Sequence, residues 1–188
     1  MGNISPEKIR NVVIAGHGGS GKTLLAESIL YTTGALNRLG SIEDGSTTSD
    51  YSKDEISRKI SINSSVLNTH WEDYKLNIID TPGNTDFTGS VKSSMRIMDT
   101  ALIVVNATEG VEVGTEIAVN YAKEYGIEIC FVVNKLDYEK SDFDSAMAQL
   151  KENYGSHVAE LQFPVNQGFG FDSIVDVLKM KLFKFNPD

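Results

Sequence analysis

Cysteine, basic residues and long apolar runs are all scarce in this chain of 188 residues. The single cysteine, Cys130, excludes a disulfide within the chain and indicates a reducing setting, so we expect a cytoplasmic protein. No apolar run approaches the roughly 18 residues of a membrane-spanning helix, so we expect no membrane partner. The formal net charge of −9 argues against a surface that grips nucleic acid broadly. We expect no sequence-specific nucleic-acid contact, and the length suits one domain with a sizeable core.

Short apolar runs alternate with helical patterns along the chain. Strands are predicted at residues 12–15, 60–69, 74–79, 101–105 and 129–133, the second and third forming a hairpin. Helices are predicted over 24–31 and within 111–126, where Gly126 provides a stop. This order favours an α/β fold with a mostly parallel sheet, one antiparallel edge strand and helices on both faces.

A glycine-rich loop follows the first predicted strand. Its sequence, GHGGSGKT at residues 16–23, fits the phosphate-binding pattern G-x-x-x-x-G-K-[ST] between a strand and a helix. Backbone N–H groups in such a loop form a nest for anionic oxygens, and the following helix adds the positive end of its dipole. Lys22 is expected to bridge the outer phosphates and the Thr23 hydroxyl to hold Mg²⁺. The predicted nucleotide-binding residues here are Gly16, His17, Gly18, Gly19, Ser20, Gly21, Lys22, Thr23 and Leu24.

A second loop, NIIDTPGNTDF at residues 77–87, follows another apolar strand. It places Asp80 at a strand end, where its carboxylate can reach Mg²⁺ through water. Gly83 can offer its N–H to a terminal phosphate because no Cβ stands in the way. Taken alone, the Thr-Pro-Gly sequence also suits a plain turn.

A third loop, VVNKLD at residues 132–137, also follows an apolar strand. The Asp137 carboxylate can accept two hydrogen bonds from guanine, and adenine has no such pair of donors. Asn134 would brace the loops, and the stem of Lys135 would lie along the base. Because the three loops meet at the ligand-binding edge of an open α/β sheet, the predicted nucleotide is GTP.

These segments resemble the GTP-binding domain of translational GTPases, which are P-loop NTPases, and most closely the N-terminal G domain of elongation factor G. The resemblance includes GSTTSDYSKDEISRKISI at residues 45–62, here called the first switch segment, and residues 77–87, the second switch segment. It implies that GTP is hydrolysed to GDP and phosphate in concert with the ribosome. It further implies Mg²⁺ held by Thr23, Ser61 and Asp80, with Lys22, Gly83 and Asn84 as catalytic residues.

The chain departs from the family pattern at four positions. Asn84 stands where a histidine usually helps to place the attacking water, so we expect hydrolysis slower by a factor of about 10². Ser61 replaces the usual threonine and Lys59 the usual glycine. Gly19 replaces an aspartate that could hold a monovalent cation.

The resemblance implies a G-domain core over residues 1–160 and the start of an insertion over 161–188, without the final strand and helix. Residues 174, 175, 178 and 182 have helical spacing, and the resemblance places a strand and a helix in this part of the chain. Residues 34–59 show no clear period. Acidic residues in that segment are expected to form a solvated face rather than a metal site: Glu43, Asp44, Asp50, Asp54 and Glu55.

Three functions compete. The first is a GTP-driven ribosome factor of translocase type, and a ribosomal protection protein shares most of its features. The second is a GTP-dependent switch, a monomer like the first, that hydrolyses little and acts by binding partners, which Asn84 favours. The third is an ATPase with the same phosphate loop, which Asp137 argues against.

Overall fold

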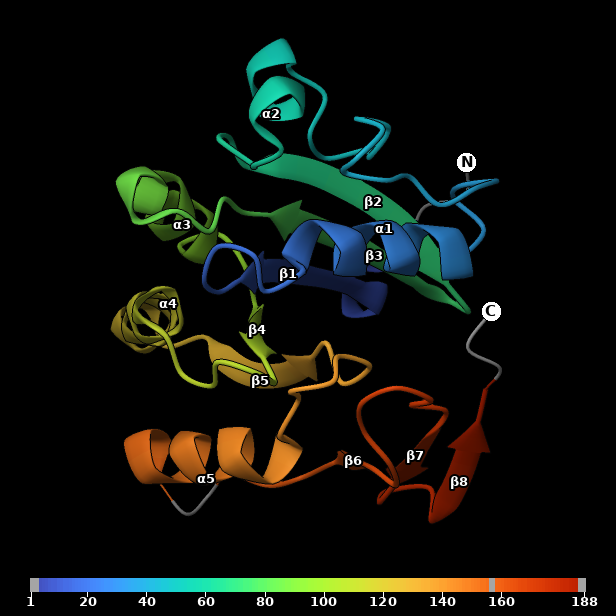
Figure 1. Cartoon of the computed structure of the whole chain (residues 1–188). Helices are drawn as coiled ribbons and strands as arrows, with labels where there is room; N and C mark the ends of the chain where they lie inside the picture. The colour runs from blue at the N-terminus through green and yellow to red at the C-terminus, as the bar shows by residue number, and fades with distance from the viewer. Residues whose placement is uncertain (1–3, 156–157, 186–188) are drawn as a thin grey trace. The chain divides into compact units, whose positions relative to one another are not determined.

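The computed structural model describes residues 4–155 and 158–185 (Figure 1). The chain divides into two compact units. Unit one comprises Met1–Val104 and Val113–Val132, and unit two comprises Val105–Glu112 and Val133–Asp188.

Five strands form the main sheet, in the order β2-β3-β1-β4-β5. β1 pairs in parallel with β3 and with β4, whereas β2 pairs antiparallel with β3 at the edge. The expected mostly parallel sheet with an antiparallel edge strand is therefore confirmed. The strands are β1 (Ile9–Ala15), β2 (Ser65–Trp71), β3 (Tyr74–Asp80), β4 (Thr100–Asn106) and β5 (Glu128–Asn134).

Helices cover both faces of this sheet (Figure 1). Helix α1 (Lys22–Thr32) packs through Ala26 and Leu30 against Ile14, Ile78 and Val104. Because neighbouring strand residues point to opposite faces, the fully buried Val13 and Ile103 lie on the other face. That side is covered by α3 (Thr88–Met95) and α4 (Val113–Tyr125). Burying each of these apolar side chains contributes about 1.5–3 kcal/mol to the stability of the fold. The sheet is therefore a firm support for the loops at its edge.

The edge hairpin begins later than expected. β2 starts at Ser65, which pairs with Asp80 at the end of β3, so residues 60–64 have no strand partner. The backbone N–H groups of Ile62 and Asn63 instead donate to the Glu55 carboxylate. The expectation of a strand over 60–64 was therefore wrong.

The segment at 34–59 also contains a helix that its sequence period does not reveal. α2 (Lys53–Arg58) begins with a capping box, in which Ser52 and Glu55 each accept the other's backbone N–H. Two single turns of 3-10 helix complete unit one, η1 (Pro6–Lys8) and η2 (Thr85–Phe87).

Unit two carries α5 (Phe143–Tyr154) and a separate antiparallel sheet in the order β6-β7-β8. The helix expected from residues 174–182 was wrong, because Ile174 and Leu182 lie in facing strands of a hairpin. Asp176 accepts the N–H of Lys179 and so stabilises the turn between these strands. The three strands are β6 (Gln162–Pro164), β7 (Ser173–Asp176) and β8 (Lys181–Lys184).

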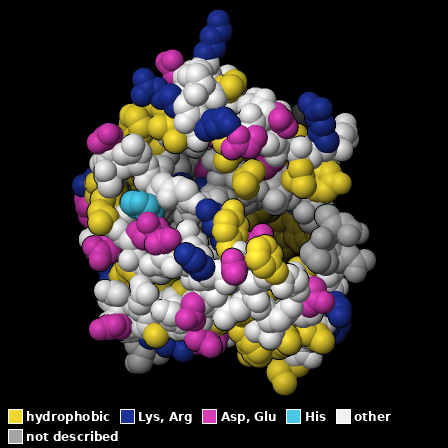
Figure 2. Space-filling model, viewed as in Figure 1, with side chains coloured by type: hydrophobic (Ala, Val, Ile, Leu, Met, Phe, Trp, Pro, Cys, Tyr) yellow, Lys and Arg dark blue, Asp and Glu magenta, His cyan; other side chains and the backbone are white. Residues whose placement is uncertain are grey.

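Exposed apolar side chains gather over this small sheet (Figure 2). All three strands follow residue 160, while a domain boundary at that residue stays a prediction. In the described part of the chain, none of the helices combines the length and the apolar character needed to span a bilayer.

Candidate functional site

The glycine-rich loop connects β1 to α1, and two of its glycines are required by the backbone. Gly16 has a φ of +136°, and a Cβ there would collide with the carbonyl oxygen of Val104 on the neighbouring strand. Gly21 caps the start of α1 with a φ of +99°. Both conformations favour glycine, so the loop can leave the sheet closely and turn directly into the helix.

Lys22 lies beneath this loop with only 6% of its surface exposed. Its ammonium donates a hydrogen bond of 2.7 Å to the carbonyl oxygen of His17. The imidazole Nδ1 of His17 accepts a hydrogen bond of 3.2 Å from the N–H of Gly114, at the start of α4. The loop is thus fastened at one point by its own lysine and at another by a neighbouring helix.

The second switch segment lies directly against the loop. The N–H and the hydroxyl of Thr81 both donate to the carbonyl oxygen of Ile14, at 3.2 and 2.8 Å. A Cβ added to Gly83 would lie 2.8 Å from the backbone N and Cα of Gly18 and would also meet the ammonium of Lys22. Gly83 and Lys22 are therefore brought together, as a shared contact with a terminal phosphate requires.

A cluster of oxygen atoms surrounds the end of β3. Asp80 is 1% exposed, and among the described residues no donor forms a hydrogen bond of normal geometry with either carboxylate oxygen. Burial raises the pKa of Asp80 to about 6, although the nearby hydroxyls of Thr23 and Ser49 and the charge of Lys22 oppose that rise. The Thr23 hydroxyl lies 3.1 Å from that of Ser61.

These residues fit a bound Mg²⁺ ion. An unpaired carboxylate costs free energy inside a protein unless a cation compensates it. Hydroxyl and carboxylate oxygens are the ligands that Mg²⁺ takes, together with water and phosphate. The three predicted ligands, Thr23, Ser61 and Asp80, therefore form a chemically suitable set within one unit.

Asp50 also belongs to this cluster, and the sequence did not reveal it. Asp50 is buried, and burial raises the pKa of its carboxyl while the hydroxyl of Ser61 lowers it. Glu55 is buried as well, so the expectation of a solvated acidic face was wrong for these two residues. It was correct for Glu43, Asp44 and Asp54, which are exposed.

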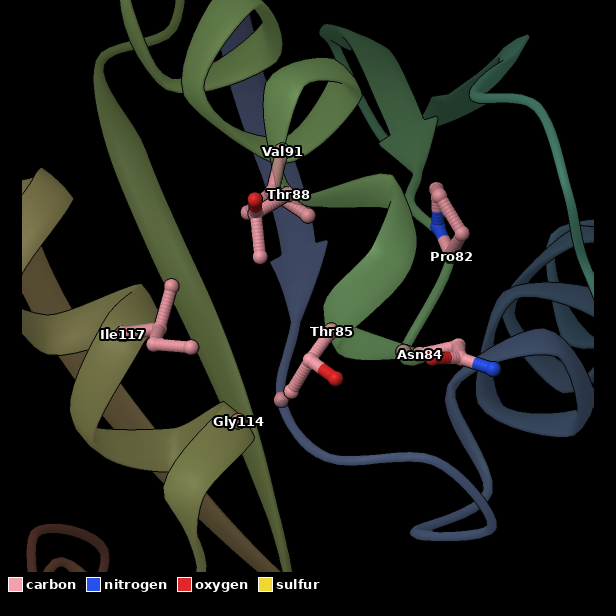
Figure 3. Close-up of a pocket in the computed structure, with 9 residues that line it drawn as sticks. Pro82, Asn84, Thr85, Thr88, Val91, Gly114 and Ile117 are labelled. Carbon is pink, nitrogen blue, oxygen red and sulfur yellow. The ribbon is translucent and has the colours of Figure 1, made fainter.

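Asn84 caps the short helix η2, where its Oδ1 accepts a hydrogen bond of 3.1 Å from the N–H of Asp86. It also lies at the rim of a pocket lined in part by Pro82, Thr85 and Ile117 (Figure 3). In this view the Asn84 amide points away from Ile117, while Thr85 and Ile117 face the pocket. The amide oxygen of Asn84 is thus engaged locally.

The segment predicted to read guanine lies in unit two. The carbonyl of Asn134 accepts the N–H of Ala107 at 2.9 Å, and Lys135 adopts a φ of +62°. The ammonium of Lys135 lies 5.1 Å from the ring centroid of Tyr138. Asp137 is exposed. The contact of Asn134, Lys135 and Asp137 with a base stays a prediction.

Residues 7–184 match the sequence model of the elongation factor Tu GTP binding domain. The chain belongs to this family. It is accordingly a GTP-binding domain of the translational GTPase type, a class whose members bind GTP together with Mg²⁺.

A crystal structure of a protein from Thermus thermophilus is similar to this GTP-binding domain, with a TM-score of 0.90 and 33% sequence identity. The likeness covers 96% of this chain and 27% of that protein. The chain therefore spans about a quarter of the length of the solved protein that it matches.

Proposed function

We propose that this GTP-binding domain is part of an elongation factor G-like translation factor, which hydrolyses GTP to GDP and phosphate in concert with the ribosome. The observation that supports it most is the meeting of both switch segments with the phosphate loop. Gly83 lies against Gly18 and Lys22, and Ser61 lies against Thr23. Ordering of these two segments by a terminal phosphate is how GTPases convert hydrolysis into a change of shape.

The loop residues have separate roles in this proposal. The backbone N–H groups of residues 16–24 bind phosphate oxygens, and Lys22 exchanges the His17 carbonyl for the outer phosphates. The hydroxyls of Thr23 and Ser61, with Asp80 acting through water, hold Mg²⁺. Bound Mg²⁺ would neutralise charge on the β- and γ-phosphates. The N–H of Gly83 stabilises charge on the terminal phosphate.

Asn84 makes the domain a slow enzyme in the absence of an activator. An asparagine amide can hydrogen-bond the attacking water but cannot become cationic, and it is shorter than histidine. Its oxygen is also engaged by Asp86. Much of the rate therefore has to come from a partner, as for GTPases in general.

Guanine specificity is assigned to unit two. Asp137 accepts hydrogen bonds from guanine, Asn134 braces the neighbouring loop, and the stem of Lys135 lies along the base. Because adenine would leave the carboxylate unpaired, the domain should prefer GTP to ATP by several orders of magnitude.

The hydrogen bond between the Asn84 amide oxygen and the N–H of Asp86 also favours a second candidate. This is a GTP-dependent switch that hydrolyses little and works by binding partners. Two measurements separate the candidates. Calorimetry in Mg²⁺ should show binding of GTP and GDP but not ATP, and turnover of GTP should rise when ribosomes are added. Binding without stimulation by ribosomes would support the switch, and equal affinity for ATP would contradict both.

A further inference from the structure

Glu27 is a buried carboxylate that none of the predicted roles requires. It lies on α1, is 2% exposed, and follows Thr23 by one helical turn. Charged side chains are seldom buried this completely unless partners satisfy them. The partners of Glu27 therefore show what it does.

Within the described ranges, the hydrogen bonds to its carboxylate come from one stretch of chain, residues 40–48. Its Oε1 accepts the N–H of Gly40 at 3.0 Å and the hydroxyl of Thr48 at 3.3 Å. Its Oε2 accepts the N–H of Thr48 at 3.0 Å. Gly40 approaches so closely that an added Cβ would lie 2.5 Å from the same carboxylate. Glu27 thus fastens both ends of this stretch to α1.

Residues 40–48 lead directly to the cluster of oxygen atoms at the end of β3. Thr48 precedes Asp50 by two residues, and the carbonyl of Ser49 between them accepts the hydroxyl of Ser65 at 2.6 Å. On the far side of the cluster, Glu55 holds the residues that follow Ser61, through the N–H groups of Ile62 and Asn63. The first switch segment is therefore held on both sides of the residues that would contact Mg²⁺.

The position of Glu27 on α1 links this anchor to the phosphate loop. Residues four apart lie on the same face of a helix, so Thr23 and Glu27 are neighbours on α1. Helix α1 consequently carries Thr23, a predicted Mg²⁺ ligand, and Glu27, which anchors the first switch segment. That segment supplies the second predicted ligand, Ser61.

We propose that Glu27 is a positioning residue that holds the first switch segment over the metal site and so raises the affinity for Mg²⁺ with GTP over that for GDP. The inference rests on the proposed function. If the segment is closed in only a fraction of molecules, the apparent affinity of a ligand that needs it falls by that fraction. GDP binding depends on the phosphate loop, whereas the hydrogen bonds described for the Glu27 carboxylate go to Gly40 and Thr48.

The test compares Glu27→Ala and Glu27→Gln with the wild-type chain, by titration with a non-hydrolysable GTP analogue and with GDP in Mg²⁺. We expect Glu27→Ala to weaken analogue binding by about 10- to 100-fold, as the loss of two or more hydrogen bonds predicts. GDP affinity should change by less than about threefold on the same grounds. Glu27→Gln keeps one acceptor oxygen, so its affinity for the analogue should lie between those of Glu27→Ala and the wild type.

Ser28→Ala is the matched control, since it removes an exposed hydroxyl on the same helix, one that donates to the carbonyl of Leu24. Amide hydrogen exchange at Gly40 and Thr48, measured without nucleotide, should quicken in Glu27→Ala but not in Ser28→Ala. Should Glu27→Ala unfold, Glu27→Gln and Thr48→Val carry the same test, each with a partial loss of analogue affinity.

Equal losses for the analogue and GDP, or wild-type analogue affinity in folded Glu27→Ala, would overturn the inference. A wild-type chain that binds neither nucleotide would instead refute the proposed function. In that case unchanged amide exchange at Gly40 and Thr48 would also refute the anchoring by Glu27.

Discussion

The hydroxyl of Thr23 lies 3.1 Å from the hydroxyl of Ser61, although 38 residues separate them in the chain. This contact closes the first switch segment over the phosphate loop. It brings a residue of α1 and a residue of an irregular segment to one point, next to the buried carboxylate of Asp80. In the proposed site, Mg²⁺ binding would therefore depend on the state of the first switch segment.

Removing the hydroxyl of Ser61 should weaken binding of Mg²⁺ with a GTP analogue. We expect Ser61→Ala to raise the Mg²⁺ concentration needed for half-maximal binding by about tenfold, the effect of losing one charge-assisted contact. Ser61→Thr should keep or improve the affinity because its χ1 is stiffer. Titration with Mg²⁺ provides the measurement, and Ser57→Ala, which removes an exposed hydroxyl of α2, is the control. Equal curves for Ser61→Ala and the wild type would contradict the assignment.

A side chain at position 83 should separate the second switch segment from the loop. In Gly83→Ala the new Cβ would meet the backbone of Gly18 at 2.8 Å, and backbone cannot move aside cheaply. We expect affinity for the GTP analogue to fall by about tenfold or more, as a clash of about 1–3 kcal/mol implies. Gly89→Ala is the control, because its added Cβ would meet no described residue within 4 Å outside its own helix. Similar binding by both variants would mean that the loop relaxes.

The loops and the sheet could be predicted because their chemistry is local. A phosphate loop needs set residue types at set spacing, and the shortness of apolar runs such as residues 101–105 favours buried strands over helices. Glu27 escaped prediction because its burial depends on where residues 40–48 fold back. Asp50 escaped it because its neighbours include Ser61 and Lys22, which are distant in the sequence. No period in the sequence encodes such a long-range contact.

Two other differences have local explanations. Ser52 and Glu55 have the capping-box spacing that indicates the start of a helix. The helix itself, α2, has only six residues, too few to show a hydrophobic period. Residues 174, 178 and 182 are four apart, a spacing that suits one helix face. In the structure Ile174 pairs with Phe183 and Val175 pairs with Leu182, so Ile174 and Leu182 lie on opposite faces of the strand pair. The turn at Asp176 decides for strands.

Replacing Asn84 by histidine should speed hydrolysis. We expect Asn84→His to raise the single-turnover rate by about 10², the usual contribution of one general acid–base group. Affinity for GDP should stay the same, since Asn84 lies outside the loop. Asn84→Ala is the control. It loses the hydrogen bond from the N–H of Asp86 without gaining an imidazole, so it should not hydrolyse GTP faster than the wild type. No gain in Asn84→His would show that position 84 does not limit the rate.

Glu55 should make stability depend on pH. Burial alone would raise the pKa of its carboxyl, but hydrogen bonds from Asn63, Ser52 and Ile62 outweigh it and hold the pKa below its ordinary value. The stabilisation is therefore present above the unfolded pKa of about 4.3 and is lost as the pH falls through the folded value. We expect Glu55→Gln to lower the free energy of unfolding by about 1–3 kcal/mol at pH 7 and by less at pH 3. Denaturation at both pH values measures this, with the exposed Asp54→Asn as control.

Gly16 and Gly19 of the phosphate loop should differ in how well they tolerate substitution. At Gly16 any side chain would strike the Val104 carbonyl. At Gly19 an added Cβ would meet no atom of the described residues within 4 Å, apart from its chain neighbours, and only a φ of +76° disfavours other residues. Asparagine and aspartate tolerate that conformation better than most. Selection from a randomised library should therefore return glycine alone at the first position and small polar substitutes at the second.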